Sequence, residues 1–224
     1  MNTETKIISG IGIVTLVILV VGVFLLSRTP QTTANEPRQL SDNEKQYLVR
    51  EDSHQTNKDA KLMVVEFADF QCPACASVHP AVTQIRQEYS DKINFVFRHM
   101  PLSDIHKNAV NAAIASEAAS QQGKFWEMYD QLFNAQSVWS DKDNPISDFE
   151  KLAENSGVDL VKFKSDYDAK IKESKIDSDY SDAVSLGVNS TPTFIINNKV
   201  YPGSLSYEDL KRIIDSELEL LPAG

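Results

Sequence analysis

The chain contains only two cysteines, and both lie in one short motif, Cys72-Pro73-Ala74-Cys75. A disulfide between two such cysteines can be opened by a thiolate from another molecule, so a C-x-x-C pair is suited to thiol–disulfide exchange. Two cysteines are too few for a disulfide scaffold or for a zinc site of four thiolates. The motif therefore indicates redox chemistry carried by one pair of sulfur atoms.

The sequence around the motif predicts a strand followed by a helix. Residues 62–67 form a mostly apolar run of strand length, and apolar residues recur at helical spacing over residues 78–89. Cys72 is then expected at the helix N-terminus, with Pro73 at the first helical position. Unpaired N–H groups and the helix dipole favour a thiolate there. We expect Cys72 to carry the accessible sulfur and Cys75, one turn later, to point inward.

Three other interpretations of the motif remain: a buried structural disulfide, a zinc site with His79 as a third ligand, and a pair of inert thiols. So short a disulfide loop contributes little entropic stabilisation, and no second Cys/His pair lies at zinc-motif spacing. Inert thiols would be unusual outside a cell, where oxidants persist. His79 itself is expected to be a half-exposed packing residue. The histidines without a spacing that suggests catalysis are His54, His99 and His106, and the tryptophans expected in the core or on the insertion surface are Trp126 and Trp139.

The remaining elements predict an α/β fold. Residues 93–97 predict a second strand, which makes a βαβ unit with a parallel pair. From about 103 to 186 the apolar spacing is helical throughout, and strand character returns at residues 193–196 and 199–201 before a last amphipathic helix at residues 210–218. Two strands and one helix make too small a core, so both halves must share one sheet. The block of helices is then an insertion.

Residues 7–26 are uncharged and dominated by Ile, Val and Leu. As a helix rising about 1.5 Å per residue, this segment matches a hydrocarbon layer of roughly 30 Å. We predict a transmembrane anchor after a short tail at residues 1–6. A cleaved signal peptide, whose apolar region is usually about 7–15 residues, and a buried core helix are the alternatives. The charge asymmetry is weak, and we expect the rest of the chain on the extracytoplasmic side of the cell membrane.

Residues 27–60 are polar and predict a tether. Within it, Ser41 and Glu44 have capping-box spacing, which predicts a short helix toward Tyr47. The domain itself is expected over residues 61–224.

The chain has 22 basic and 32 acidic residues, a net charge of -10. This balance argues against a nucleic-acid partner and against contact with anionic lipid headgroups. Membrane contact is therefore expected through residues 7–26 alone.

The segment from Val64 to Cys75, VVEFADFQCPAC, resembles the active-site segment of the DsbA-like thiol:disulfide oxidoreductases of the thioredoxin superfamily, and most of all their membrane-anchored bacterial members. The segment Ser190-Thr191-Pro192-Thr193-Phe194 resembles the cis-proline loop of the same superfamily. The similarity runs from about residue 47 to residue 218 and includes QGKFW at residues 122–126. It implies a thioredoxin-like fold with a helical insertion.

The resemblance also implies roles for single residues. Cys72 is the nucleophile and Cys75 the resolving cysteine, while Pro192 is cis and places its loop against the disulfide. The backbone of Thr191 would pair with an extended substrate segment, and Pro73 and Ala74 would contact that substrate. A proline at the start of a strand is the alternative interpretation of Pro192.

Glu66, six residues before Cys72, matches the buried acid that this family has beneath its disulfide. The resemblance implies proton exchange with Cys75 through water. A buried acid is costly without a task or a partner, and a position at the rim of the sheet is the alternative.

These expectations combine into a membrane-tethered, extracytoplasmic oxidase that introduces disulfides into exported cysteine-containing proteins. The resemblance suggests re-oxidation by a quinone-linked membrane partner of the DsbB or vitamin K epoxide reductase type. No metal and no cofactor are expected. The Pro-Ala pair between the cysteines does not set the reduction potential, so a reductase or isomerase of the same fold remains an alternative. A membrane-tethered binding module without turnover is another.

Overall fold

The computed structural model describes residues 37–221. The predicted tail at 1–6, the predicted anchor at 7–26 and the first part of the predicted tether lie outside this range. Among the described residues, no helix is both long and apolar enough to cross a membrane.

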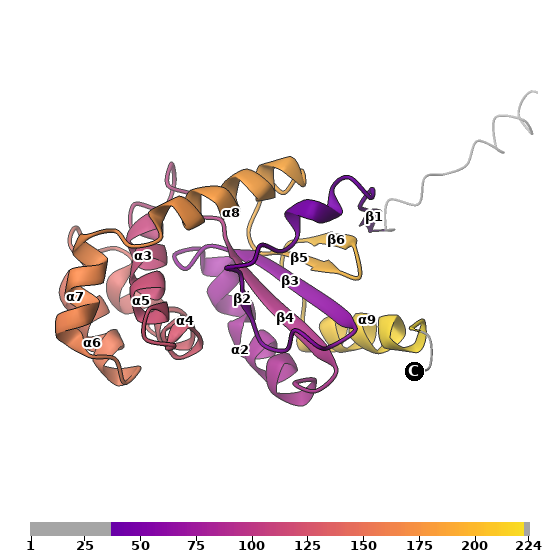
Figure 1. The fold of residues 1–224 in the computed structure, drawn as a ribbon, viewed down its shortest axis with the longest axis horizontal. Coiled ribbons are helices and arrows are strands. Elements are labelled where there is room, and N and C mark those ends of the chain that lie inside the picture. Colours follow the sequence, from indigo (N-terminus) through magenta and orange to yellow (C-terminus); the bar gives the residue numbers. More distant parts are fainter. Residues whose placement is uncertain (1–36, 222–224) are drawn as a thin grey trace, which may run out of the picture. The chain divides into compact units, whose positions relative to one another are not determined.

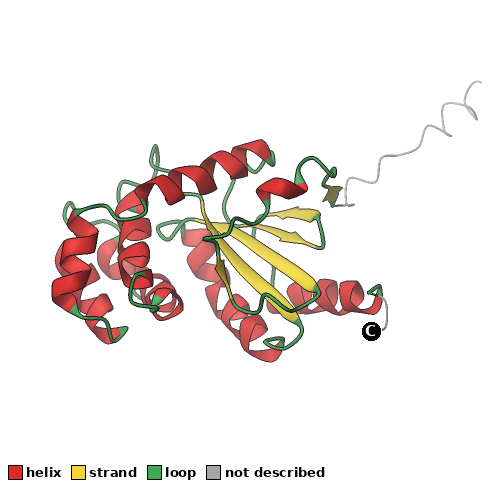
Figure 2. Ribbon diagram, viewed as in Figure 1, coloured by secondary structure: helices red, strands yellow, loops and turns green. Residues whose placement is uncertain are grey.

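A six-stranded mixed sheet forms the centre of the described chain, in the order β1-β6-β5-β3-β4-β2 (Figures 1 and 2). Strands β3 and β4 run parallel, and the other neighbouring pairs are antiparallel. Helix α2 (Pro73–Glu88) connects the parallel pair, which gives the predicted βαβ unit. The strands are β1 (Arg38–Gln39), β2 (His54–Gln55), β3 (Leu62–Ala68), β4 (Ile93–His99), β5 (Thr193–Ile196) and β6 (Lys199–Pro202).

Helices cover both faces of this sheet because the central strands are apolar on both sides. Val64 packs with the side chains of α2 (Pro73–Glu88) and α9 (Tyr207–Glu219) on one face. Its neighbour Val65 points the other way, as alternation along a strand requires. It packs beneath α8 (Glu173–Ser185) and the residues flanking the 3-10 helix η1 (Lys45–Tyr47).

The block of helices between β4 and β5 occupies residues 109–185, in agreement with the predicted insertion at about 103–186. Its first five helices, α3 to α7 (residues 109–168), lie to one side of the sheet in Figure 1, and α8 returns over one face of the sheet. Its apolar stripe, Phe125, Met128, Leu132 and Phe133, is buried as predicted. The α/β fold with a helical insertion is therefore confirmed. The remaining helices are α3 (Ala109–Ser120), α4 (Phe125–Asn134), α5 (Gln136–Trp139), α6 (Ile146–Asn155) and α7 (Leu160–Asp168).

Residues 37–60 differ from the predicted tether, because they belong to the folded domain. Strand β1 extends the sheet beside β6, and β2 extends it beside β4. Leu40 and Leu48 are buried in the core between them. The predicted short helix is a single 3-10 turn, and the Glu44 carboxylate accepts hydrogen bonds from the Ser41 amide and hydroxyl. A strand of two residues is too short to show an alternating apolar pattern, so the polar composition of this segment predicted a tether instead.

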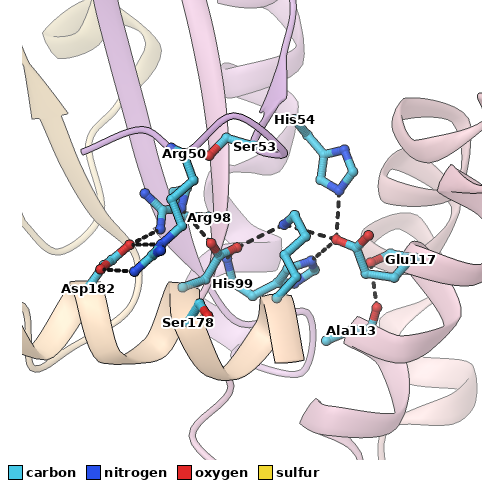
Figure 3. Close-up of polar contacts among 12 residues, drawn as sticks. Arg50, Ser53, His54, Arg98, His99, Ala113, Glu117, Ser178 and Asp182 are labelled. Carbon is cyan, nitrogen blue, oxygen red and sulfur yellow. Dashed lines mark hydrogen bonds and ion pairs between the residues drawn. The ribbon is translucent and has the colours of Figure 1, made fainter. Parts of the chain in front are cut away.

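A group of charged side chains, which we call the charge network, joins this N-terminal segment to the insertion, and all of it except the Arg50 side chain is largely buried (Figure 3). Its centre is Arg98 of β4, whose guanidinium donates to Asp179 at 2.7 Å and to Asp182 at 2.5 Å. Arg50 also donates to Asp182. Lys175 lies 3.0 Å from both Asp179 and Glu117. Because unpaired buried charges are costly, these contacts hold β4, α3, α8 and the N-terminal segment together.

Two histidines complete the charge network at Glu117. The Nε2 atoms of His54 and His99 lie 2.7 and 2.8 Å from the same carboxylate oxygen, Oε1. Burial alone raises the pKa of Glu117, but the two histidine hydrogen bonds hold it well below its usual range. These three residues are close enough to bind a metal ion, yet the Lys175 ammonium contacts the same oxygen. That fixed cation opposes a divalent ion, so we assign the group to hydrogen bonding.

Candidate active site

The two cysteines lie where β3 leads into α2. Cys72 is the N-cap residue of α2, with extended backbone angles, and Pro73 is the first helical residue. The amide of Cys72 donates to the carbonyl of Asp69 at 3.0 Å, which closes the turn before the helix. Both cysteines are free thiols. Cys75 is fully buried and Cys72 is only 7% exposed, so Cys72 is more covered than the sequence suggests.

The loop that covers Cys72 comes from the far end of the chain. The Thr191–Pro192 peptide bond is cis, and the Cys72 sulfur lies 3.4 Å from the carbonyl oxygen of Thr191, to which it donates when it is protonated. Pro192 directly precedes β5, and its carbonyl accepts from the amide of Gly203. The Thr191 hydroxyl is buried without a hydrogen-bond partner. The two motifs, 119 residues apart in the chain, therefore meet at one sulfur atom.

The two thiols have opposite acidities. The hydrogen bond from the Cys75 thiol is the largest influence on Cys72 and lowers its pKa to about 5. The Thr191 side chain and the amides of Cys75 and Ala74 also lower this pKa, and together these groups outweigh partial burial. Burial raises the pKa of Cys75 well above its ordinary value, and the adjacent Cys72 raises it further. At neutral pH the pair thus holds one thiolate, on Cys72, and one thiol, on Cys75. Such a thiolate is a good leaving group in thiol–disulfide exchange.

Glu66 lies inside the sheet rather than at its rim. It stands in the middle of β3, opposite Phe97 of β4 and Phe194 of β5, and is 1% exposed. Its Oε2 accepts a hydrogen bond from the Tyr129 hydroxyl at 2.9 Å, and its Oε1 has no partner. Burial raises the pKa of Glu66 to about 7, although Tyr129 and Arg86 oppose that shift. This carboxyl can therefore give or take a proton near neutral pH.

The predicted substrate contacts are partly open to solvent. Pro73 is exposed and Ala74 is half-buried at the start of α2, whereas Thr191 is mostly covered. Pro73 and Ala74 lie between the two cysteines in sequence. The first turn of α2 is therefore open to solvent directly beside Cys72.

The sequence did not point to the side chains that hold the active-site loop. Gln136 of α5 donates to the carbonyls of Phe70 and Cys72, at 2.7 and 2.9 Å. The Asp69 carboxylate accepts from the amides of Gln71 and Leu102. These residues carry no motif, and their role depends on segments that meet only in the fold. The buried acid Asp69 directly after β3 is the one signal that could have indicated this site.

The histidines have partners that their spacing did not predict. His79 is buried, not half-exposed, and its Nε2 lies 2.9 Å from Asp130 of α4. His106 lies 2.6 Å from the Asp69 carboxylate, and His54 and His99 belong to the charge network. The core position expected for Trp139 is confirmed, since it is fully buried, and Trp126 packs partly buried against the core.

The fold and the paired cysteines define a thioredoxin-like oxidoreductase with the DsbA-like arrangement of sheet and inserted helices. A thioredoxin family model, Thioredoxin_4, matches residues 49–216. The chain belongs to this family, and the match includes both cysteines, Glu66 and Pro192.

Solved structures share this fold. The chain is 22% identical to Wolbachia pipientis α-DsbA1, with a TM-score of 0.70, over 79% of this chain and 96% of that one. It is 23% identical to oxidised BdbD from Bacillus subtilis, with a TM-score of 0.67, over 82% of this chain and 98% of that one. At these identities the likeness concerns the fold.

Curated proteins with higher identity are longer. The chain is 37% identical over 162 residues to the Na(+)/H(+) antiporter NhaA 1 of Mycolicibacterium gilvum. The matched region covers 70% of this chain and 25% of that protein. It is 36% identical over 159 residues to the Na(+)/H(+) antiporter NhaA 3 of Salinispora tropica. That match covers 71% of this chain and 24% of that protein. The chain thus spans about a quarter of the length of these relatives.

Proposed function

We propose that this protein is an extracytoplasmic thiol:disulfide oxidase that introduces disulfides into exported cysteine-containing proteins. The observation that carries the proposal is the pair of unequal thiols beneath a cis-proline loop. A Cys72 pKa of about 5 stabilises the reduced form, and a stabilised reduced form makes the disulfide oxidising. Likeness in fold to α-DsbA1 and BdbD supports the same class of reaction.

The reaction begins with the Cys72–Cys75 disulfide. A substrate thiolate attacks Cys72 Sγ, a mixed disulfide forms, and Cys75 leaves as a thiolate that takes a proton from Glu66. A second substrate thiolate attacks the substrate sulfur of the mixed disulfide and expels the Cys72 thiolate. Two substrate thiols are thereby oxidised, and the two electrons remain on the reduced cysteine pair.

Substrate binding is proposed at the rim formed by Pro73, Ala74 and the Thr191 backbone. An extended peptide can add to this edge as a short strand. Re-oxidation is proposed through a quinone-linked membrane partner of the DsbB or vitamin K epoxide reductase type, which accepts the two electrons. Residues 7–26 are proposed as the anchor that keeps the domain near that partner. No part of the proposal rests on antiport by the NhaA relatives.

The direction of the reaction is tested by equilibrating the full-length chain, in detergent, with glutathione buffers. The oxidised fraction is read by alkylation of free thiols. A reduction potential of about -120 mV supports the oxidase, whereas a value of about -270 mV overturns it in favour of a reductase. A Cys75→Ala variant should accumulate mixed disulfides on Cys72. A Cys72→Ser, Cys75→Ser variant that keeps full cellular function would instead indicate a binding module.

The proposed location is tested in intact cells that express the full chain. After mild reduction, a membrane-impermeant maleimide should label Cys72, and the chain should stay in the membrane fraction after a carbonate wash. Labelling that occurs only after lysis would overturn the extracytoplasmic placement. Release of the chain by carbonate would overturn the anchor at residues 7–26.

A further inference from the structure

Buried polar atoms without partners are concentrated at the active site. Among the described residues, three buried side-chain nitrogen or oxygen atoms have no hydrogen-bond partner: Glu66 Oε1, Arg86 Nε and Thr191 Oγ1. Native structures satisfy nearly all buried polar atoms, so each exception calls for an explanation. Thr191 belongs to the loop over Cys72. Glu66 and Arg86 instead both contact Tyr129.

Tyr129 connects the helical insertion to the acid beneath the cysteines. It lies in α4, is fully buried, and donates its hydroxyl proton to Glu66 Oε2 at 2.9 Å. Burial raises the pKa of Tyr129 well above its ordinary value, and the Glu66 charge raises it further. The hydroxyl therefore stays protonated throughout the working pH range and acts only as a donor. It occupies one oxygen of Glu66 and leaves the other free.

Arg86 of α2 supplies the positive charge next to this hydrogen bond. Its guanidinium carbon lies 4.1 Å from the centre of the Trp126 ring and 5.1 Å from that of Tyr129. Only 13% of the side chain is exposed. One terminal nitrogen donates to Asp130 at 3.2 Å. A cation held between aromatic rings in this way is poorly screened by water, so it acts on Glu66 from a fixed position.

Two other titratable groups, Cys75 and His79, lie near Glu66. Cys75 lies on α2, and its thiol is affected by the negative charge of Glu66. His79, also on α2, has its ring centre 5.4 Å from that of Tyr129 and is paired with Asp130. The strand neighbours of Glu66, Phe97 and Phe194, are apolar. Tyr129 and Arg86 are therefore the groups that lower the pKa of the Glu66 carboxyl, whereas burial raises it.

We propose that Tyr129 and Arg86 are positioning residues that fix the Glu66 carboxyl, with Oε1 left to exchange a proton with Cys75, so that the helical insertion sets the pH range of the redox site. This inference rests on the proposed function. When Cys75 leaves as a thiolate, Glu66 donates its proton and becomes a carboxylate. The Tyr129 hydrogen bond and the Arg86 charge stabilise that carboxylate. When the disulfide re-forms, Glu66 takes the proton back.

The test is Tyr129→Phe in the full-length chain, which removes only the hydroxyl. Loss of a hydrogen bond to the ionised form should raise the Glu66 pKa, by about one pH unit. Infrared difference spectra of the carboxyl C=O band, assigned by its loss in Glu66→Gln, measure this pKa without any activity assay. The pH midpoint of disulfide exchange with glutathione should move upward by the same amount. Arg86→Gln should shift both in the same direction, and Arg86→Lys should restore most of the wild-type value.

Two controls separate positioning from general damage. Tyr167→Phe alters a half-buried tyrosine of the insertion that packs on Phe149 and Phe163, and it should leave the Glu66 band and the pH midpoint unchanged. In a Glu66→Gln background, Tyr129→Phe should no longer move the midpoint. An unshifted carboxyl band in Tyr129→Phe would overturn the inference, as would a shift that persists without Glu66. A wild-type chain that fails to exchange with glutathione at any pH would overturn the proposed function, while the band still measures the Tyr129 contact.

Discussion

The domain contains two buried polar clusters that are built in opposite ways. In the charge network, three cations (Arg50, Arg98 and Lys175) face three carboxylates, and none of its buried side-chain nitrogen or oxygen atoms lacks a partner. The redox cluster consists of Cys72, Cys75, Glu66, Tyr129, Arg86 and Thr191. It includes the three unpartnered atoms found among the described residues.

This difference separates a structural role from a chemical one. A fully paired network is held in one arrangement, since any movement would expose a buried charge to an apolar environment. An atom without a partner is free to accept a proton or a new bond, and its environment shifts its pKa. Oε1 of Glu66 is such an atom, and burial raises the pKa of that carboxyl to about 7. The Cys72 sulfur differs, because hydrogen bonds from its neighbours lower its pKa to about 5. The pairing of buried polar atoms therefore indicates which cluster does chemistry.

The largest effect on stability is expected in the charge network. Arg98→Met leaves Asp179 and Asp182 buried with one cation fewer, which should lower the free energy of unfolding by about 3–5 kcal/mol. Urea denaturation measures this change. The matched control Arg212→Met removes an exposed arginine paired with Asp209 and should cost less than about 1 kcal/mol. A loss for Arg98→Met as small as that of the control would mean that the network does not hold the domain together.

Within the redox cluster, Glu66 should contribute to stability with a pH dependence opposite to that of an ordinary paired acid. The folded-state pKa of Glu66, about 7, lies above its ordinary value of 4.5. The folded chain thus binds this proton more tightly than the unfolded chain. The Glu66 contribution to stability should therefore fall as pH rises from about 4.5 to about 7 and stay reduced above that range. The pKa of Cys72, lowered from 9.0 to about 5, contributes in the opposite sense between those two values, so the Glu66 effect is read as a difference between two variants.

Glu66→Gln removes this ionisation and should leave the folded chain more stable than wild type at pH 8, by about 3 kcal/mol, with little difference at pH 4.5. Urea titrations of both reduced proteins at the two pH values measure it. In the same variant, exchange should slow by roughly 100-fold, because the proton exchanger is lost. The exposed Glu208→Gln is the control and should change neither quantity. Equal destabilisation of Glu66→Gln at both pH values would contradict the assigned pKa.

The smallest effect is expected in the loop before Cys72, beside the redox cluster. Gln136→Ala removes the side-chain donor shared by the carbonyls of Phe70 and Cys72. It should lower the free energy of unfolding by about 1–2 kcal/mol. The control Gln121→Ala alters an exposed glutamine whose side-chain amide donates to the Ser120 hydroxyl at 3.4 Å. If both variants behave alike, Gln136 does not support the loop.

Local sequence was sufficient to predict the elements whose apolar patterns extend over many residues. The βαβ unit, the buried insertion stripe and the position of Cys72 at a helix N-terminus follow from apolar spacing and from Pro73. Polar composition misled at residues 37–60, where β1 and β2 are two residues long and belong to the sheet through pairing alone. A strand this short has no period, so only its hydrogen-bonded neighbour identifies it.

By itself, the sequence determined which atoms could react: two sulfur atoms one helical turn apart, an acid six residues upstream, and a proline loop near the far end of the chain. Tertiary structure alone decided how they behave. Tyr129 reaches Glu66 across 63 residues, and Gln136 reaches Cys72 across 64. Acidity depends on burial and on close partners, and both arise only when segments distant in the chain pack together.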